Sequence, residues 1–276
     1  MSKKRIAENF GKAACHYDES AALQRRVGER LWLQMESVLS VNLSVGNTTL
    51  IDLGCGSGYF TKKIKQRIEG EVIGLDISSD MLNYSMEQCQ EQKSIFFVNA
   101  DAEKIPLRCA SADVIFSNFV LQWCDDLRRA LGESLRILKP GGCFAFSIPI
   151  EGTLIELESC WKSVDANRHV NSFYSKKEIE TMLLSALDEK ELDSSFVDIN
   201  ISSYQCANYY ETFKDILQDL KQIGANTVKG ARSGGLMGKT RFAYLAENYE
   251  RFRNEKGLPA TYQVLNVIVE RKVINT

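Results

Sequence analysis

Short apolar runs alternate with helical patterns through residues 49–148 of this 276-residue chain. The apolar runs predict five β-strands, at 48–54, 71–76, 94–101, 112–118 and 142–149. The stretches between them predict helices at 59–68, 78–92 and 127–138, where apolar side chains recur every three or four residues. Strands that alternate with helices build a parallel sheet with helices on both faces. This pattern therefore predicts an α/β fold.

A glycine-rich stretch, LIDLGCGSGYF, joins the first strand to the first helix. A dinucleotide-binding turn reads G-x-G-x-x-G, and Gly54 and Gly56 match its first two glycines. The third glycine would fall at Tyr59, whereas this chain has Gly58 instead. The resulting pattern D-x-G-x-G-x-G, which begins at Asp52, resembles the first motif of S-adenosylmethionine-dependent methyltransferases with a Rossmann-like fold.

The charges of the two ligands give this difference a physical reason. A pyrophosphate is anionic and favours a helix N-terminus. The methionine part of S-adenosylmethionine carries an ammonium and a sulfonium, which favour a tight loop with carbonyl and carboxylate groups nearby. Asp52, beside the glycines, suits an ammonium partner. Asp76, at the end of the second strand, can accept hydrogen bonds from both ribose hydroxyls.

Further polar residues follow the third and fourth strands. In the methyltransferases that this chain resembles, the acid at Asp101 contacts the adenine amine and the next residue, here Ala102, contacts the ring. Asn118 and Gln122 would close the methionine side of the site. These positions all fall at the carboxyl ends of strands, where open parallel sheets bind ligands. We therefore predict S-adenosylmethionine as cofactor and S-adenosylhomocysteine as product.

The pattern changes after Pro149, where a longer, mostly helical segment begins. It predicts helices within 152–190, 209–226 and 239–254, and two further strands at 196–204 and 261–273. We predict a single Rossmann-like domain with a seven-stranded, mostly parallel sheet. Its parts are a helical cap at 1–45, a donor-binding core at 46–150, a helical lid and substrate insertion after the fifth strand at 151–240, and a last helix and strand at 241–276.

Composition and charge exclude several other classes of protein. The formal net charge of −2 gives no reason to expect nucleic acid as a partner. The N-terminus, MSKKRIAENF, lacks the apolar core of a signal peptide, and no apolar run is long enough to span a membrane. Eight scattered cysteines without a CxxC pair, and only two histidines, argue against a metal site. We expect a cytoplasmic protein that binds neither metal nor membrane.

Three motifs that would indicate another chemistry are incomplete. A phosphate-binding loop ending in the GKT at 238–240 would need a glycine at position 233, which is Ser233. Enzymes that methylate amino groups of bases often carry [DN]-P-P-[YF] after the fourth strand, where this chain has SNFVL. Cys124 lies in QWCDD, where two neighbouring acids would raise its pKa, so we interpret it as structural rather than nucleophilic. Trp123 and Trp161 are expected in the core.

Other stretches resemble one family more closely. They are FGKAACHYDESAALQRRV (10–27), LQWCDDLRRAL (121–131), GTLIELESCWKSVDANRHVNSF (152–173) and GLPATYQVL (257–265). Together they resemble the malonyl-[acyl-carrier protein] O-methyltransferases of biotin synthesis, over about residues 10 to 273. The family's reaction transfers a methyl group to the free carboxylate of a malonyl thioester, carried by acyl carrier protein or by coenzyme A.

The resemblance also suggests which residues handle the acceptor. Tyr17 and Gln24 lie on the N-terminal segment, which folds over the donor in similar enzymes. His169 and Arg232 lie in the insertion and could orient the malonyl carboxylate. Because a carboxylate is already ionised at neutral pH, with a pKa of about 4, the reaction needs no general base. Two alternatives stay open: a methyltransferase acting on a quinone or sterol ring carbon, and a donor-binding protein without activity.

Overall fold

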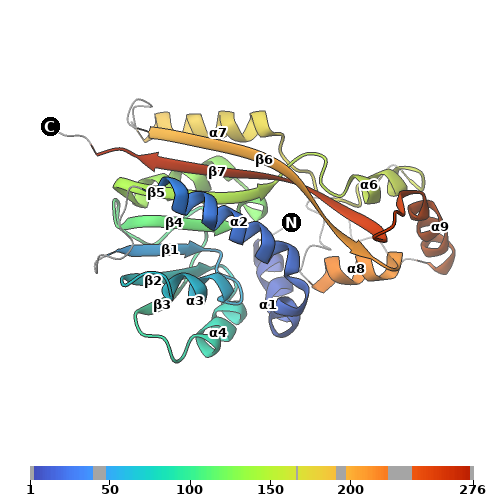
Figure 1. Cartoon of the computed structure of the whole chain (residues 1–276), viewed down its shortest axis with the longest axis horizontal. Helices are drawn as coiled ribbons and strands as arrows, with labels where there is room; N and C mark the ends of the chain where they lie inside the picture. The colour runs from blue at the N-terminus through green and yellow to red at the C-terminus, as the bar shows by residue number, and fades with distance from the viewer. Residues whose placement is uncertain (1–2, 40–47, 166, 191–196, 223–237, 274–276) are drawn as a thin grey trace.

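In the computed structural model, which describes residues 3–39, 48–165, 167–190, 197–222 and 238–273, seven strands form one sheet (Figure 1). Their order across the sheet is β3-β2-β1-β4-β5-β7-β6. The strands are β1 (Thr49–Leu53), β2 (Glu71–Asp76), β3 (Ile95–Asn99), β4 (Ala112–Asn118), β5 (Leu138–Pro149), β6 (Val197–Tyr210) and β7 (Leu258–Arg271). β7 is antiparallel to both of its neighbours, and the other adjacent pairs are parallel. This confirms the predicted seven-stranded, mostly parallel sheet.

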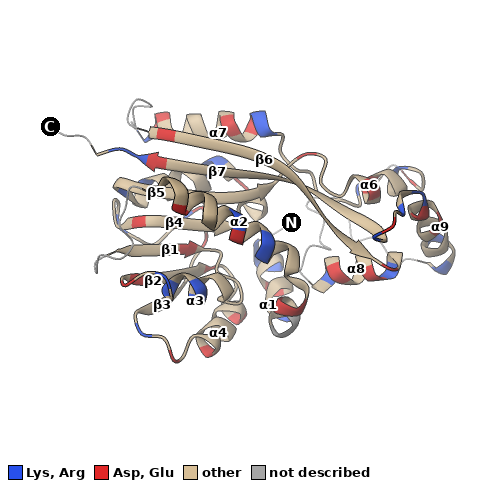
Figure 2. Ribbon diagram, in the orientation of Figure 1, with Lys and Arg blue, Asp and Glu red and all other residues tan. Residues whose placement is uncertain are grey.

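Helices connect the strands and cover the sheet. They are α1 (Lys3–Ser20), α2 (Ala22–Val38), α3 (Tyr59–Lys65), α4 (Ser79–Gln88), α5 (Leu127–Ile137), α6 (Ile155–Lys162), α7 (Lys176–Glu189), α8 (Phe213–Gln222) and α9 (Lys239–Tyr249), with short 3-10 helices at Leu121–Trp123 and Glu250–Phe252. Figure 2 shows charged residues mainly on these helices and near the strand ends, while the middle of the sheet is almost free of them.

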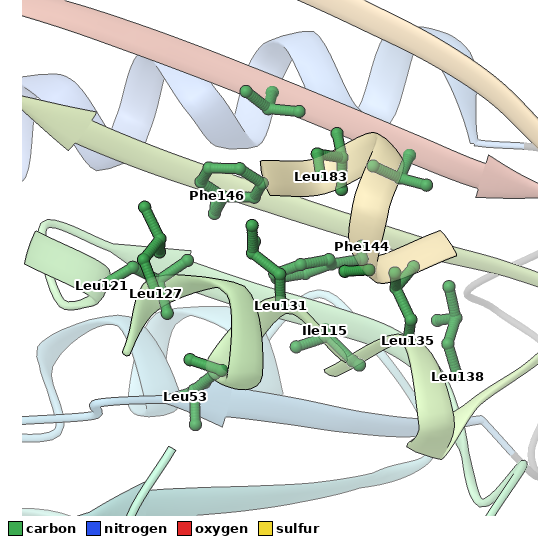
Figure 3. Close-up of a cluster of buried hydrophobic side chains, with 14 of the residues drawn as sticks. Leu53, Ile115, Leu121, Leu127, Leu131, Leu135, Leu138, Phe144, Phe146 and Leu183 are labelled. Atoms are coloured by element: carbon green, nitrogen blue, oxygen red, sulfur yellow. The ribbon is translucent and has the colours of Figure 1, made fainter. Parts of the chain in front are cut away.

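Successive side chains of a strand point to opposite faces of the sheet, so a residue's position in its strand decides which helices it contacts. Ile51, Ile115 and Phe144 form one row across three strands, and all three pack in a core cluster with α5 and α7. Figure 3 shows Leu131 of α5 and Leu183 of α7 closing over Phe144 and other residues of this cluster. The neighbouring row points to the opposite face, where Trp32 of α2 packs in a second core cluster with α3. Full burial of each large apolar side chain stabilises the fold by about 1.5–3 kcal/mol.

The last two strands are longer than the sequence pattern predicts. β6 continues to Tyr210 and β7 begins at Leu258, because these two residues pair at the far end of the β6–β7 ladder. The predicted helix 209–226 therefore begins later, at Phe213, and its residues after Gln222 lie outside the described part of the chain. The paired strands extend beyond the rest of the sheet towards α6, α8 and α9 (Figure 1).

The predicted lid divides into two parts with different surroundings. α6 and α8 share one buried cluster with α9, the predicted last helix, and this cluster includes Trp161, Phe213 and Leu245. They lie together with α1 beyond the end of the sheet (Figure 1). α7 instead packs on α5 in the main core, where Ile179 and Leu183 are buried. The prediction that the whole of 151–240 forms a lid is therefore wrong for α7, because its apolar stripe covers a face of the sheet.

Candidate active site

The glycine turn after β1 adopts backbone angles that suit glycine. Gly54, Gly56 and Gly58 have φ values of 76°, 53° and 79°. A Cβ at Gly54 would lie 2.2 Å from a methyl of Val120, so this position has no room for a side chain. A Cβ at Gly56 would meet nothing within 4 Å, because this residue borders two adjoining cavities. The backbone of the turn is thus open to a ligand.

The first cavity lies at the carboxyl ends of the parallel strands and holds about 770 Å³, counting space open to solvent. Asp76, Asp101 and Ala102 line it, as does Asn118, so it brings together polar residues predicted from the ends of β2, β3 and β4. Helix α1 covers it with the side chains of Lys3, Ile6, Phe10 and Tyr17. The sheet and the N-terminal helix therefore form this cavity jointly.

The carboxylate of Asp76 is held in place by the loop around it. Its Oδ2 accepts a hydrogen bond from Gly56 N at 2.9 Å, and its Oδ1 accepts one from Ser78 N at 2.8 Å. Burial raises the pKa of this carboxyl above its usual value, although the backbone donors oppose the shift. Each oxygen keeps a lone pair that a ligand hydroxyl can reach.

Asp101 has a partner that the sequence did not indicate. Lys3 Nζ lies 2.6 Å from Asp101 Oδ2 and 2.7 Å from Glu103 Oε1. Glu103 is itself buried and accepts hydrogen bonds from the backbone N–H groups of Asp125 and Asp126. Lys3 thereby fixes the first turn of α1 over one end of the first cavity. No sequence motif marks this contact, because its partners are 98 residues apart.

A second cavity adjoins the first through the glycine turn, Tyr17 and Asn118. Asp52 lines it and is buried, and it accepts a hydrogen bond from Thr61 Oγ1 at 2.5 Å. Burial raises the pKa of Asp52 to about 7, and the charge of Asp76 adds to this effect against the Thr61 hydrogen bond. The carboxyl is therefore poised to ionise when a cation binds beside it.

Gln24 and Asn118 connect α2 to the end of β4 across this second cavity. Asn118 Nδ2 donates to the backbone carbonyl of Gln24 at 2.9 Å, and Asn118 Oδ1 accepts from Ser147 Oγ at 2.7 Å. Gln24 is buried, and its side-chain Oε1 has no hydrogen-bond partner among the described residues. Gln122 donates from Nε2 to the Phe119 carbonyl and is not among the residues that line either cavity. The structure therefore brings Gln24 and Asn118 to the site, but not Gln122.

Tyr17 occupies the boundary between the two cavities. Burial, with the charges of Asp76 and Asp18 nearby, raises the pKa of Tyr17 well above its usual range, so its hydroxyl stays a neutral donor. Its ring lies edge-on to Phe10, which in turn packs edge-on against Trp123. Trp123 lines the first cavity, so the expectation that it belongs to the core is wrong. It lies there because the chain turns through a short helix directly after β4.

His169 lies elsewhere, beside the buried cluster that α6, α8 and α9 share. Its ring stacks on Trp161 with centroids 3.5 Å apart, and its Nε2 lies 2.9 Å from Asp165 Oδ1. Trp161 is buried in that cluster, as expected from the sequence. His169 lines neither cavity, so the structure does not place it where it could orient an acceptor, because stacking holds the ring against Trp161. Arg232 lies outside the described residues.

We expect His169→Ala to lower the free energy of unfolding by about 1–2 kcal/mol, since it removes a stacked ring and a hydrogen bond. The turnover rate and the donor affinity should change by less than about twofold. Thermal unfolding, calorimetry and steady-state rates test this, with His169→Phe as the variant that keeps the stacking. A selective loss of turnover in a variant of native stability would instead restore a role in catalysis.

Two further observations concern ligands and membranes. Among the described residues, no three His, Cys, Asp or Glu side chains gather into a group that could hold a metal ion. None of the helices in the described ranges has the length and apolar character needed to cross a membrane.

Comparisons with known proteins agree with this arrangement. Residues 51–146 match the family model described as a methyltransferase domain. The chain is 35% identical over 265 residues to a malonyl-[acyl-carrier protein] O-methyltransferase from Hahella chejuensis, covering 96% of this chain and 89% of the relative. It is 35% identical over 272 residues to a protein of the same name from Serratia marcescens, covering 99% and 97%. The biotin biosynthesis bifunctional protein BioHC of Cellvibrio japonicus is also 35% identical, over 98% of this chain and 50% of the relative.

Solved structures share the fold at much lower identity. The YcgJ protein from Bacillus subtilis has a TM-score of 0.59 at 15% identity and covers 88% of this chain and 97% of its own. Phosphoethanolamine N-methyltransferase 2 of Haemonchus contortus, solved with phosphomonomethylethanolamine and S-adenosylhomocysteine, has a TM-score of 0.52 at 17% identity and covers 87% of this chain and 52% of its own. Both confirm the Rossmann-like methyltransferase architecture.

Proposed function

Because the chain belongs to the malonyl-[acyl-carrier protein] O-methyltransferase family, we propose that it transfers a methyl group from S-adenosylmethionine to the free carboxylate of a malonyl thioester. The thioester is carried by acyl carrier protein, with coenzyme A as the alternative. The methyl ester would hide the negative charge and let fatty-acid synthesis elongate the chain as an ordinary acyl primer. This places the enzyme at an early step of biotin synthesis, in agreement with the name of the Cellvibrio relative.

One observation carries the choice of donor: the glycine turn borders two adjoining cavities, of which one is lined by Asp76 and Asp101 and the other by Asp52. The carboxyl of Asp52, in a partly enclosed cavity, fits an ammonium. Asp76 would hold the ribose and Asp101 with Ala102 the adenine. S-adenosylmethionine supplies a methyl group activated by its sulfonium when it is bound. The residues thus fit this cofactor from end to end.

The protein's own contribution is mainly to align two reactants. Holding a nucleophile and an electrophile in the reactive geometry can lower the barrier by about 7–11 kcal/mol. Phe10, Phe119 and Trp123 form an apolar wall beside Tyr17, which keeps water from the acceptor. The neutral hydroxyl of Tyr17 can donate to a carboxylate and orient it without removing its charge. That Arg232 also orients the acceptor carboxylate stays a prediction from the sequence.

The direct test is mass spectrometry of malonyl-acyl carrier protein and malonyl-CoA after incubation with enzyme and donor. We expect the malonyl carrier to gain the mass of one CH₂ group while S-adenosylhomocysteine accumulates. Acetyl carriers, which lack the carboxylate, should stay unchanged. Donor binding without any product would favour a non-catalytic protein, and methylation of a quinone or sterol ring carbon in place of the thioester would favour the other alternative.

The pH dependence of kcat should differ from that of kcat/KM for the donor. Turnover at saturation should be flat between about pH 6 and 8, since the acceptor is already ionised and Tyr17 stays neutral. The kcat/KM for the donor should rise as the pH increases through about 7, because Asp52 must lose its proton before it can pair with the donor ammonium. Initial rates across this range test both statements, with Asp52→Asn as control. A steep rise in single-turnover rates would instead show that proton removal from the acceptor matters.

A further inference from the structure

Two carboxylates lie close together where the chain turns after β3. Asp101 and Glu103 belong to one tight turn, which the Lys104 N–H closes by donating to the Asp101 carbonyl at 2.9 Å. Asp101 lines the first cavity, whereas Glu103 is only 6% exposed. Like charges repel each other, and burial strengthens the repulsion because little water screens it. A cation between the two carboxylates therefore stabilises the turn.

Lys3, in the first turn of α1, supplies that cation. Its Nζ lies 2.6 Å from Asp101 Oδ2 and 2.7 Å from Glu103 Oε1, so it bridges the two acids. Burial would lower the pKa of Lys3, but the hydrogen bonds to these carboxylates outweigh that effect and raise the pKa above its usual value. Lys3 also lines the first cavity. It therefore places a lasting positive charge in the wall of the cavity, directly against Asp101.

The Asp101 carboxylate is held through both of its oxygens. Oδ2 receives Lys3, and Oδ1 accepts a hydrogen bond from Glu103 N at 2.9 Å. An ionised carboxylate only accepts hydrogen bonds, and each of its oxygens here keeps about one further lone pair. Such a group favours an amine, which donates, over a carbonyl, which cannot. It can therefore distinguish adenine from hypoxanthine, which has a carbonyl in place of the exocyclic amine.

We propose that Lys3 is a positioning residue for the adenine of the donor, because it holds the Asp101 carboxylate in the orientation that receives the exocyclic amine. This inference rests on S-adenosylmethionine being the donor. Ile6, Phe10 and Tyr17 of the same helix line the first cavity. The residue that orients Asp101 thus belongs to the helix that covers the cavity, so α1 takes part in selecting the base of the donor.

The test compares two nucleosides that differ only in the base. Isothermal titration calorimetry would measure binding of S-adenosylhomocysteine, which carries adenine, and of S-inosylhomocysteine, which carries hypoxanthine. The variants are Lys3→Met, Lys3→Arg and the matched control Lys4→Met, with Lys3→Gln as a replacement if Lys3→Met does not fold. Lys4 is the next residue on α1 and is exposed, and among the described residues it lines neither cavity. Asp101→Ala, alone and combined with Lys3→Met, completes a double-mutant cycle.

We expect the wild type to bind S-adenosylhomocysteine about tenfold or more tightly than S-inosylhomocysteine, from one hydrogen bond to a charged acceptor. Lys3→Met should lower this preference by about 3- to 10-fold, while binding of S-inosylhomocysteine changes by less than about twofold. Lys3→Arg should keep most of the preference, since a guanidinium also donates to carboxylates, and Lys4→Met should behave like the wild type. In the Asp101→Ala protein, Lys3→Met should not change the preference further. This pattern would support the inference even if the malonyl thioester proved to be the wrong acceptor.

Other outcomes would overturn the inference. Equal losses for both nucleosides would show that Lys3 only holds α1 over the cavity, and an unchanged preference in Lys3→Met would show that Asp101 does not depend on it. A loss of preference that persists without Asp101 would show that Lys3 acts by another route. If the wild type bound both nucleosides equally well, the assignment of Asp101 and Lys3 to adenine would fall while the donor stood. If it bound neither, the proposed donor itself would be wrong.

Discussion

Replacing Asp76 by alanine is expected to weaken S-adenosylmethionine binding by about tenfold or more. The change removes the carboxylate and with it one or two charge-assisted hydrogen bonds to the ribose, each contributing about 1.5–3 kcal/mol. The same change leaves Gly56 N and Ser78 N without their acceptor, so the glycine turn also loses support. Calorimetry with S-adenosylmethionine and S-adenosylhomocysteine measures the loss.

Asp113→Ala is the matched control for this experiment. Asp113 also accepts a backbone hydrogen bond, from Thr49 N, and pairs with Lys139 at 2.7 Å, but it lies near the amino end of β4. The control should lose stability without losing donor affinity. Asp76→Asn keeps one acceptor oxygen and tests the charge alone. Native donor affinity in a folded Asp76→Ala protein would remove Asp76 from the site, and tight binding of NADH by the wild type would reject the donor.

Replacing Tyr17 by phenylalanine is expected to slow methylation of a malonyl thioester by about 10- to 100-fold. The change removes one hydrogen bond to a charged acceptor, worth about 1.5–3 kcal/mol if it is made in the transition state. The ring and its contact with Phe10 remain, so donor affinity should change by less than about twofold. Single-turnover rates with saturating donor, together with calorimetry, separate the two effects.

Tyr59→Phe is the matched control. Tyr59 lines the second cavity but not the first, and its ring packs against the guanidinium of Arg25. Arg232→Ala should be measured in parallel. From its place in a glycine-rich segment, we predict a loss of about 10²–10³ in rate if it pairs with the acceptor carboxylate. A Tyr17→Phe enzyme with native turnover, beside a slow Arg232→Ala enzyme, would assign the acceptor carboxylate to Arg232. An equal loss of donor binding and rate would make Tyr17 a packing residue.

The family could be identified from the sequence because several of its features lie in short continuous stretches of the chain. The stretches around Tyr17 and after Pro149 resemble one methyltransferase family, and similarity over nearly the full chain confirms that assignment. The glycine turn and the acids at the ends of β2 and β3 could be placed together from the strand and helix pattern alone. The reason is topological: parallel strands have their carboxyl ends at one edge of the sheet, so residues that follow them must meet there.

The same kind of reasoning failed for residues whose surroundings depend on how the elements pack together. An amphipathic pattern in α7 shows that one stripe is buried, but not whether it meets the sheet or the lid. His169 belongs to a stretch that resembles the family, yet its stacking on Trp161 depends on how the chain folds back after α6. The same holds for Trp123, which reaches the first cavity only through the turn after β4.

By itself, the sequence determined the strand–turn–helix order, and with it the edge of the sheet where Asp52, Asp76 and Asp101 lie. Hydrogen bonding and side-chain periodicity act over a few residues, so their traces can be read locally. Only the tertiary structure decided what covers that edge. Lys3 reaches Asp101, and Gln24 reaches the end of β4, across 98 and 94 residues of chain. Such contacts follow from the packing of whole elements against one another, and the periodic pattern of one element does not say which other element it meets.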